Sequence, residues 1–299
     1  MPLRIAVASG KGGTGKTTVA VNLFHIISKK LTPKVQLIDC DVEEPNDILF
    51  FPDATRSSEK TATQTIPFID NFKCTYCRKC VDWCEFNAIV VIPHVEFAEV
   101  NPSLCHSCGA CSVACEHQAI TAIPEKIGTL TQYDMVQHGM ITEGRLKIGS
   151  PMQTLMIKQV KQEAMSDADV VILDAPPGTS CPVVETVADA DYIILVTEPT
   201  PFGLYDLKLT VELVRQLDKP LGVIINKAGL GDRKVHDYLS DEHIEILAEL
   251  PFNRSYASQY ARGDILKDIP AQIEMTYESI IQKLKVSITQ NEGDNHFKW

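Results

Sequence analysis

A run of four cysteines occurs twice in this chain, and the second copy begins 31 residues after the first. Both copies have the spacing C-x2-C-x2-C-x3-C, at Cys74, Cys77, Cys80 and Cys84, and again at Cys105, Cys108, Cys111 and Cys115. The repeat continues beyond the cysteines, since Asn87-Ala88-Ile89 corresponds to Gln118-Ala119-Ile120. An internal duplication of this kind predicts two similar units related by a pseudo-twofold axis.

This spacing is typical of iron–sulfur cluster ligands. Three closely spaced cysteines can place three thiolates around one face of a cubane, and in two-cluster bacterial ferredoxins the fourth cysteine of each run binds the other cluster. The sequence therefore predicts two [4Fe-4S] clusters with exchanged fourth ligands. The predicted ligands of cluster 1 are Cys74, Cys77, Cys80 and Cys115, and those of cluster 2 are Cys105, Cys108, Cys111 and Cys84.

A disulfide framework and structural zinc are the two other uses of so many cysteines. Zinc sites normally use two C-x2-C pairs separated by a longer loop, which is not the spacing here. No apolar signal segment opens the chain, which predicts a reducing, cytoplasmic compartment where disulfides are disfavoured. Glu85 and Glu116 replace the proline that usually follows the last cysteine, and their charge should favour the oxidised clusters.

A phosphate-binding loop follows the first apolar segment of the chain. Residues 3–8 are predicted to form a buried strand, and an apolar helical stretch begins at Val19. Between them, Gly10-Lys11-Gly12-Gly13-Thr14-Gly15-Lys16-Thr17-Thr18 satisfies the pattern G-x4-G-K-[ST]. In such a loop, backbone N–H groups cradle phosphates, Lys16 can reach the β and γ oxygens, and Thr17 can bind Mg²⁺. The predicted ligands are therefore ATP and Mg²⁺.

The second lysine of this loop, Lys11, makes it similar to the loops of the MinD/ParA group of deviant Walker A ATPases, which includes the nitrogenase iron protein. The resemblance implies that Lys11 reaches across an ATP-sandwich dimer to the partner's nucleotide. Asp39-Cys40-Asp41 resembles the family's switch I, and Asp174-Ala175-Pro176-Pro177-Gly178-Thr179 resembles its switch II. These matches imply that Asp41 orients or deprotonates the attacking water, and that Asp174 and Asp41 lie with Thr17 around Mg²⁺.

Two further segments resemble the family's adenine pocket. Asn226-Lys227 ends a predicted strand where the family reads the base, and the loop Leu250-Pro251-Phe252-Asn253 resembles the one that closes over the adenine. These segments lie at the carboxyl ends of predicted parallel strands, where open α/β sheets bind ligands.

The expected fold is α/β, with two domains. Residues 1–55 and 128–299 should form a mostly parallel P-loop sheet flanked by helices, and residues 56–127 an inserted, small α+β domain that resembles a bacterial ferredoxin, with its linkers. The polar residues 52–71 are predicted to be the entry linker. Apolar spacing over residues 273–288 predicts a helix that docks on the protein body.

The resemblance and the net charge together indicate which partners the chain should bind. We expect a homodimer, or a heterodimer with a related ATPase, formed with ATP, and also a redox or metallocofactor partner protein. The net charge of −11 argues against general binding to nucleic acid or anionic membranes. No apolar run approaches the roughly 18 residues that span a bilayer, so no membrane insertion is expected.

Three functions are compatible with these features. The chain could be an ATP-gated electron-transfer protein, an assembly or carrier ATPase for iron–sulfur or other metal cofactors, or a positioning ATPase with a redox sensor. Closed sites made only of cysteines favour the first function, because they suit permanent clusters better than transferable ones. Cys181 follows Asp174 at a spacing that resembles a cluster cysteine of the nitrogenase iron protein, but the chain offers no convincing second cysteine for a bridging cluster.

Overall fold

The computed structural model of the protein describes residues 2–30, 34–135 and 139–291. The strands are β1 Leu3–Ala8, β2 Val35–Asp39, β3 Thr55–Ile69, β4 Ile89–Ile92, β5 Phe97–Val100, β6 Ile120–Asp134, β7 Gly139–Leu146, β8 Val170–Asp174, β9 Tyr192–Thr197, β10 Leu221–Ala228 and β11 Ile246–Pro251. The helices are α1 Lys16–Lys30, α2 Lys79–Asp82, α3 Ala110–Ala114, α4 Gln153–Gln162, α5 Cys181–Val187, α6 Pro201–Gln216, α7 Lys234–Asp241, α8 Arg254–Ala261 and α9 Ala271–Asn291, with short 3-10 turns at Asp47–Phe50 and Pro93–Val95.

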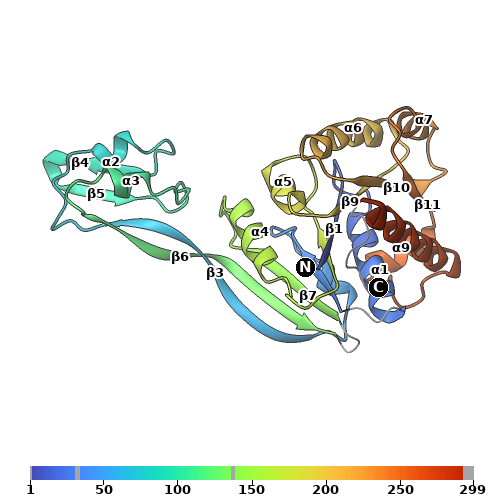
Figure 1. The fold of residues 1–299 in the computed structure, drawn as a ribbon. Coiled ribbons are helices and arrows are strands. Elements are labelled where there is room, and N and C mark those ends of the chain that lie inside the picture. The colour runs from blue at the N-terminus through green and yellow to red at the C-terminus, as the bar shows by residue number, and fades with distance from the viewer. Residues whose placement is uncertain (1, 31–33, 136–138, 292–299) are drawn as a thin grey trace.

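The body of the molecule is a sheet with the strand order β11-β10-β9-β1-β8-β2-β7-β6-β3 (Figure 1). Neighbouring strands from β11 to β7 run parallel, and β6 and β3 are added antiparallel at one edge. The central strands are buried along their whole length, as expected when helices cover both faces of a parallel sheet. The α/β fold predicted from the sequence is confirmed.

Two apolar cores lie on the two faces of this sheet. Alternate residues of β1 point to opposite sides, so that Ile5 and Val7 pack with α1 and α9, while Ala6 packs on the other side with α4, α5, α6 and α7. The predicted C-terminal helix is α9, and its Tyr277 and Ile280 are fully buried against the body, as expected.

Strands β3 and β6 form a long antiparallel ribbon that leaves the body (Figure 1). Residues 52–71, predicted to be the entry linker, do lead from the body to the lobe, but most of them, Thr55–Ile69, form one continuous strand that the sequence analysis did not predict. Ala62, Gln64 and Ile66 are buried in alternation with exposed residues. Threonine is β-branched and fits a half-buried pleated surface well, so this polar segment is also a good strand.

Residues 70–119, which we call the cysteine-rich lobe, lie at the far end of the ribbon (Figure 1). Its backbone repeats with the period of the cysteines. Positive φ angles occur in three pairs of residues 31 positions apart: Tyr76 and Ser107, Arg78 and Gly109, and Asn87 and Gln118. The internal duplication seen in the sequence is therefore also present in the chain path.

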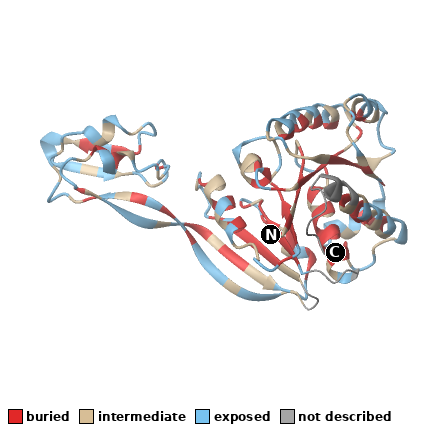
Figure 2. Cartoon of the chain, in the orientation of Figure 1, coloured by how far each residue is buried: buried red, intermediate tan, exposed pale blue. Residues whose placement is uncertain are grey.

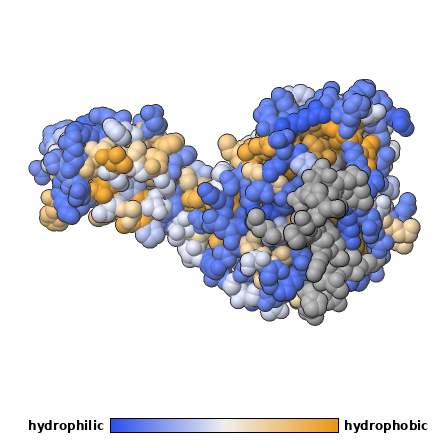
Figure 3. Space-filling model, in the orientation of Figure 1, coloured by the Kyte–Doolittle hydropathy of each residue, from blue (hydrophilic) through white to orange (hydrophobic). Residues whose placement is uncertain are grey.

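Burial differs sharply between the two parts of the molecule. Figure 2 shows buried residues concentrated in the body sheet and α1, whereas most of the lobe is exposed. In Figure 3 the visible face is mostly hydrophilic, but hydrophobic residues gather on the lobe, where Phe72, Trp83 and Val113 are among the exposed apolar side chains. Within the described ranges, the helices are too short or too polar to cross a membrane.

Candidate functional site

The loop between β1 and α1 sits at the carboxyl edge of the parallel sheet. Because β1 pairs with both β8 and β9, this loop lies beside the ends of neighbouring strands. Gly15 has φ +100°, and a Cβ atom there would lie 2.2 Å from the Asn226 amide nitrogen, so only glycine fits. The loop runs directly into α1, whose N-terminal N–H groups favour bound phosphate.

Thr17 and Asp174 meet where a magnesium ion would be expected. The Thr17 hydroxyl donates to Asp174 Oδ2 at 2.7 Å, and Oδ1 of the same carboxylate is buried without a hydrogen-bond partner among the described residues. Burial raises the pKa of Asp174, although the nearby Lys16 charge lowers it. Hydroxyl and carboxylate oxygens are ligands that Mg²⁺ prefers, so this pair fits the ion that the sequence predicts.

Two further carboxylates are fully buried beside Asp174. Burial and then the Asp174 charge raise the pKa of Asp39 to about 8. Burial and the Asp39 charge raise the pKa of Asp47 well above its usual value. No N–H or hydroxyl group of the described residues donates to either Asp47 oxygen, but the Asp47 carboxyl lies within hydrogen-bonding reach of Asp174, so the two groups can share a proton. Sequence reasoning missed Asp47. The available signal was an acid directly before the apolar residues 48–51.

The segment that we call switch I is residues 39–47, and its backbone is hydrogen-bonded to the Asp39 carboxylate. Asp39 Oδ1 accepts from the Asp41 N–H at 3.0 Å, while Oδ2 accepts from the N–H groups of Asn46 and Asp47 at 2.7 and 3.1 Å. Burial raises the pKa of Asp41, and the charge of Lys16 opposes that shift. Asp41 therefore lies close to the phosphate-binding lysine, on a loop fixed by a neighbouring carboxylate.

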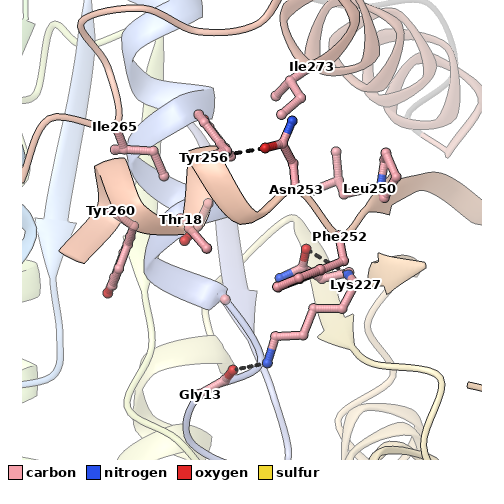
Figure 4. A pocket seen from close by; sticks show the side chains of 14 residues that line it. Gly13, Thr18, Lys227, Leu250, Phe252, Asn253, Tyr256, Tyr260, Ile265 and Ile273 are labelled. Atoms are coloured by element: carbon pink, nitrogen blue, oxygen red, sulfur yellow. Dashed lines mark hydrogen bonds between the residues drawn. The ribbon is translucent and has the colours of Figure 1, made fainter. Parts of the chain in front are cut away.

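A cavity of about 210 Å³ opens beside the P-loop (Figure 4). It is lined by Gly13, Gly15, Thr18, Asn226, Lys227, Leu250, Pro251, Phe252, Asn253, Tyr256, Ala257, Tyr260, Ile265 and Ile273. The predicted adenine residues thus share one cavity with the P-loop, and mostly apolar walls suit a planar base. Sequence reasoning missed Tyr256 and Tyr260, whose i,i+4 spacing on a helix was the available signal.

The residues at the end of β10 also form hydrogen bonds with the P-loop backbone. Asn226 Nδ2 donates to the Thr14 carbonyl at 2.7 Å. Lys227 Nζ donates to the Gly13 carbonyl at 2.9 Å (Figure 4). Asn253 has a structural role as well, because its Oδ1 accepts from the Tyr256 N–H and caps α8 (Figure 4).

Lys11 is bound within its own chain. Its ammonium donates to Glu198 Oε1, and Lys227 donates to Glu198 Oε2 at 2.9 Å. Burial alone would raise the pKa of Glu198, but hydrogen bonds from the two lysines bring it below its usual range. A Lys11 side chain that serves a partner's nucleotide must therefore first leave Glu198.

The lobe brings predicted cluster ligands together. Cys74, Cys77, Cys80 and Cys115 line one cavity, which places the fourth cysteine of the second run with the first three of the other. Cys84 packs beside Cys105 in a small apolar cluster with Ile66 and Ala88. Cys84 also packs with Cys74 and Cys80 around Cys111, so the exchange of the fourth ligands between the two clusters stays a prediction.

Backbone amides point at the sulfur atoms in a repeated pattern. The first cysteine of each run accepts from the N–H two residues later, and the fourth accepts from the N–H four residues later, at 3.3–3.4 Å. Burial, with Cys74 and Cys111 nearby, raises the pKa of Cys80 to about 11. Thiols that crowd in a partly buried cavity with amide donors are a donor set that an iron–sulfur cluster can use.

The described residues contain no group of three or more His, Cys, Asp or Glu side chains that could hold a single metal ion. A single ion needs ligands that meet at one point, whereas a cubane accepts its thiolates at separate iron atoms.

Cys40 is buried and Cys181 is exposed at the start of α5. His106 stacks on Phe86, with 3.9 Å between the ring centroids.

A search against family models matches residues 5–266 to the CobQ/CobB/MinD/ParA nucleotide-binding domain. Two uncharacterised proteins of Methanocaldococcus jannaschii are each 29% identical to the chain. One match covers 87% of this chain and 90% of the relative, and the other covers 95% and 96%. An iron-sulfur cluster carrier protein of Pseudomonas fragi is 25% identical over 91% of this chain and 74% of that protein.

Solved structures show the same fold. The cell division ATPase MinD of Pyrococcus furiosus superposes with a TM-score of 0.59 at 16% identity, covering 96% of this chain and all of that one. The septum site-determining protein MinD of Pyrococcus horikoshii, solved with Mg-ADP, also gives 0.59 at 16% identity, covering 98% of this chain and all of that one.

The phosphate-binding assignment predicts two different defects. Lys16→Ala should sharply weaken ATP binding, because it removes the charge that lies beside Asp41 and Asp174 at the phosphate end. Asp41→Asn should retain binding but slow hydrolysis at least about 100-fold, since the phosphate cradle stays intact. Nucleotide titration and phosphate release measure the two effects. Normal turnover in both variants would contradict the assignment.

The contact between Lys11 and Glu198 predicts a defect in assembly. Lys11→Ala should still bind ATP as a monomer but lose ATP-dependent dimerisation. Light scattering in an Asp41→Asn background, which keeps ATP bound, measures this. Lys34→Ala is the matched control, because Lys34 forms an exposed ion pair with Asp167 elsewhere on the surface. A parent protein that stays monomeric with ATP would rule out the sandwich dimer.

Proposed function

Because the chain belongs to the CobQ/CobB/MinD/ParA nucleotide-binding family, we propose that it hydrolyses ATP and couples an ATP-dependent dimer switch to electron transfer. The electrons would pass through two [4Fe-4S] clusters held by the cysteine-rich lobe. We further propose that residues 1–55 and 128–299 are the ATPase domain and residues 56–127 the inserted ferredoxin domain. The observation that carries the proposal is the single cavity lined by Cys74, Cys77, Cys80 and Cys115.

The residues around the P-loop suit phosphoryl transfer to water. Lys16 and the loop amides bind the phosphates, while Thr17 and Asp174 would hold Mg²⁺, which neutralises charge on the phosphate oxygens when bound. Asp41 orients the attacking water and accepts its proton, a role that its raised pKa supports. Catalysis of this kind depends mainly on positioning and on charge stabilisation.

Dimerisation would complete each site. Lys11 exchanges its Glu198 partner for the phosphates of the other subunit's nucleotide, and Lys227 remains to neutralise Glu198. The exchange makes dimer formation depend on ATP, because without phosphate Lys11 has a better partner in its own chain. The partner is a second copy of this chain or a related ATPase.

The cluster ligands suit a resident electron carrier. Each predicted site has four cysteines, and amide N–H groups that bond sulfur stabilise the reduced, more negative cluster. A carrier that donates its cluster to another protein is the second candidate. It is favoured by similarity to proteins named iron-sulfur cluster carriers, at 23–27% identity.

The cluster assignment predicts the metal content of protein purified without oxygen. It should hold about eight iron and eight labile sulfide atoms per chain, if both sites are cubanes. Cys115→Ser should damage the cluster bound by Cys74, Cys77 and Cys80, while Cys181→Ser serves as a control that leaves both intact. Reconstituted protein that binds zinc without a visible charge-transfer band would refute the assignment.

The coupling between the two parts predicts a change in cluster potential with nucleotide. EPR titrations without nucleotide, with ADP and with a non-hydrolysable ATP analogue should differ by about 59 mV for at least one cluster, or roughly 1.4 kcal/mol for one electron. Reciprocity then requires about a tenfold change in nucleotide affinity on reduction. Identical potentials and affinities, with electron transfer unaffected by nucleotide, would favour the carrier function instead.

A further inference from the structure

One short segment contacts both the nucleotide switches and the cysteine-rich lobe. Residues 147–150, which we call the bridging loop, connect β7 to α4. On one side they line a cavity of about 560 Å³ together with Asp41 of switch I and Pro176 of the segment that resembles switch II. On the other side the same residues line a second cavity with Pro102 and Ser103 of the lobe. The bridging loop is therefore a wall shared by both cavities.

Successive backbone amides at the start of this loop bind two different neighbours. The Leu146 N–H donates to the Val42 carbonyl of switch I at 2.8 Å, and the Lys147 N–H donates to the Ile127 carbonyl of β6 at 2.7 Å. The Arg145 guanidinium also donates to the Pro45 carbonyl of switch I, at 3.3 Å. Switch I and the ribbon are thus hydrogen-bonded to backbone amides of adjacent residues.

The ribbon continues this connection to a cluster ligand. Gln64 lies opposite Glu125 in the ribbon and is buried. Its Nε2 donates to the Pro102 carbonyl at 3.3 Å, and its Oε1 lies 3.5 Å from the Ser107 hydroxyl, which can donate to it. The Ser107 N–H in turn donates to Cys105 Sγ at 3.4 Å.

Along this route, the closely packed strands β6 and β7 are followed by a loosely packed turn, the bridging loop. A Cβ atom at Gly128 of β6 would lie 2.4 Å from the Arg145 carbonyl, so β6 and β7 are in close backbone contact and move together. The bridging loop itself is poorly anchored: Ile148 is fully exposed, and Gly149 has φ +81° with open space around it. A turn that can change shape between two stiff elements has the properties needed of a switch.

We propose that the bridging loop relays the nucleotide state of switch I to the lobe segment 101–107, and hence to the cluster bound by Cys105. The inference rests on the proposed function, since it requires nucleotide at the P-loop and a cluster in the lobe. The coupling is reciprocal, so the state of the lobe also changes the affinity for nucleotide.

Hydrogen–deuterium exchange on the anaerobically purified full chain tests this relay. The exchange rates with ADP and with a non-hydrolysable ATP analogue are compared for the P-loop, switch I, the bridging loop and residues 101–107. In the parent protein we expect the rates in residues 101–107 to differ at least about fivefold between the two nucleotides, the lower end of common allosteric couplings.

Two variants interrupt the relay at opposite ends. Gln64→Leu removes both hydrogen bonds to the lobe, and two glycines inserted between Leu146 and Lys147 separate the amide that bonds switch I from the amide that bonds β6. Gln132→Leu is the matched control, because Gln132 lies on the same ribbon but bonds Ser58 and the Glu163 carbonyl instead of the lobe. Cluster absorption and thermal unfolding identify any variant that is misfolded, and the other variant then decides.

The relay predicts that both variants reduce the difference in residues 101–107 to less than about twofold, while nucleotide still protects the P-loop and the control behaves as the parent. A lobe response that survives both variants would overturn the relay, as would a parent lobe that does not respond although its P-loop is protected. A parent P-loop that no nucleotide protects would instead show that the proposed function fails, and the relay with it.

Discussion

The buried carboxylates at the carboxyl edge of the sheet determine the electrostatic balance of the rest of the site. Asp39, Asp47 and Asp174 are each at most 2% exposed. Lys16 is the cation whose charge acts on Asp47 and Asp174. Buried charge without compensation is costly, so these groups hold protons or require further positive charge. The raised pKa of Asp39, about 8, reflects this demand. In the proposed function, a magnesium ion that arrives with ATP would supply the missing charge, and because Asp39 accepts hydrogen bonds from switch I, binding would act directly on the loop that carries Asp41.

Residues 55–134 extend the edge of the sheet without interrupting it. Strands β3 and β6 extend the parallel sheet beyond β7 in antiparallel pairing, so the edge of β7 is covered. At about 3.3 Å per residue, the 15 residues of β3 span roughly 50 Å. The ribbon is thus both part of the ATPase sheet and the support of the lobe. A chain that left the body through a flexible linker would not pass small displacements of switch I to the lobe.

The sequence predicted the α/β fold and the positions of the motifs, but not how the parts of the molecule are connected. Lys16, Thr17 and the eight cysteines belong to short motifs that residue type and spacing identify, and their roles stay predictions. The ribbon was missed because its threonines resemble a polar loop until the alternation of Ala62, Gln64 and Ile66 is matched to a partner strand. Asp47 was missed, and the bridging loop could not be predicted, for a related reason. Their roles come from burial and from neighbours that are distant in the sequence, such as Ile127 beside Lys147.

The small core of the lobe is consistent with a fold that depends on the proposed clusters. Its two apolar groups are built around few buried residues, among them Ile89 and Val91, and the cysteines themselves form part of that packing. A unit of 50 residues with so small a core usually needs metals or other cross-links to be stable. In the proposed function, cluster ligation would therefore supply folding free energy as well as redox chemistry. A lobe stabilised in this way would respond to the state of its clusters, and its attachment through Gln64 and the ribbon would give that response a direct route to switch I.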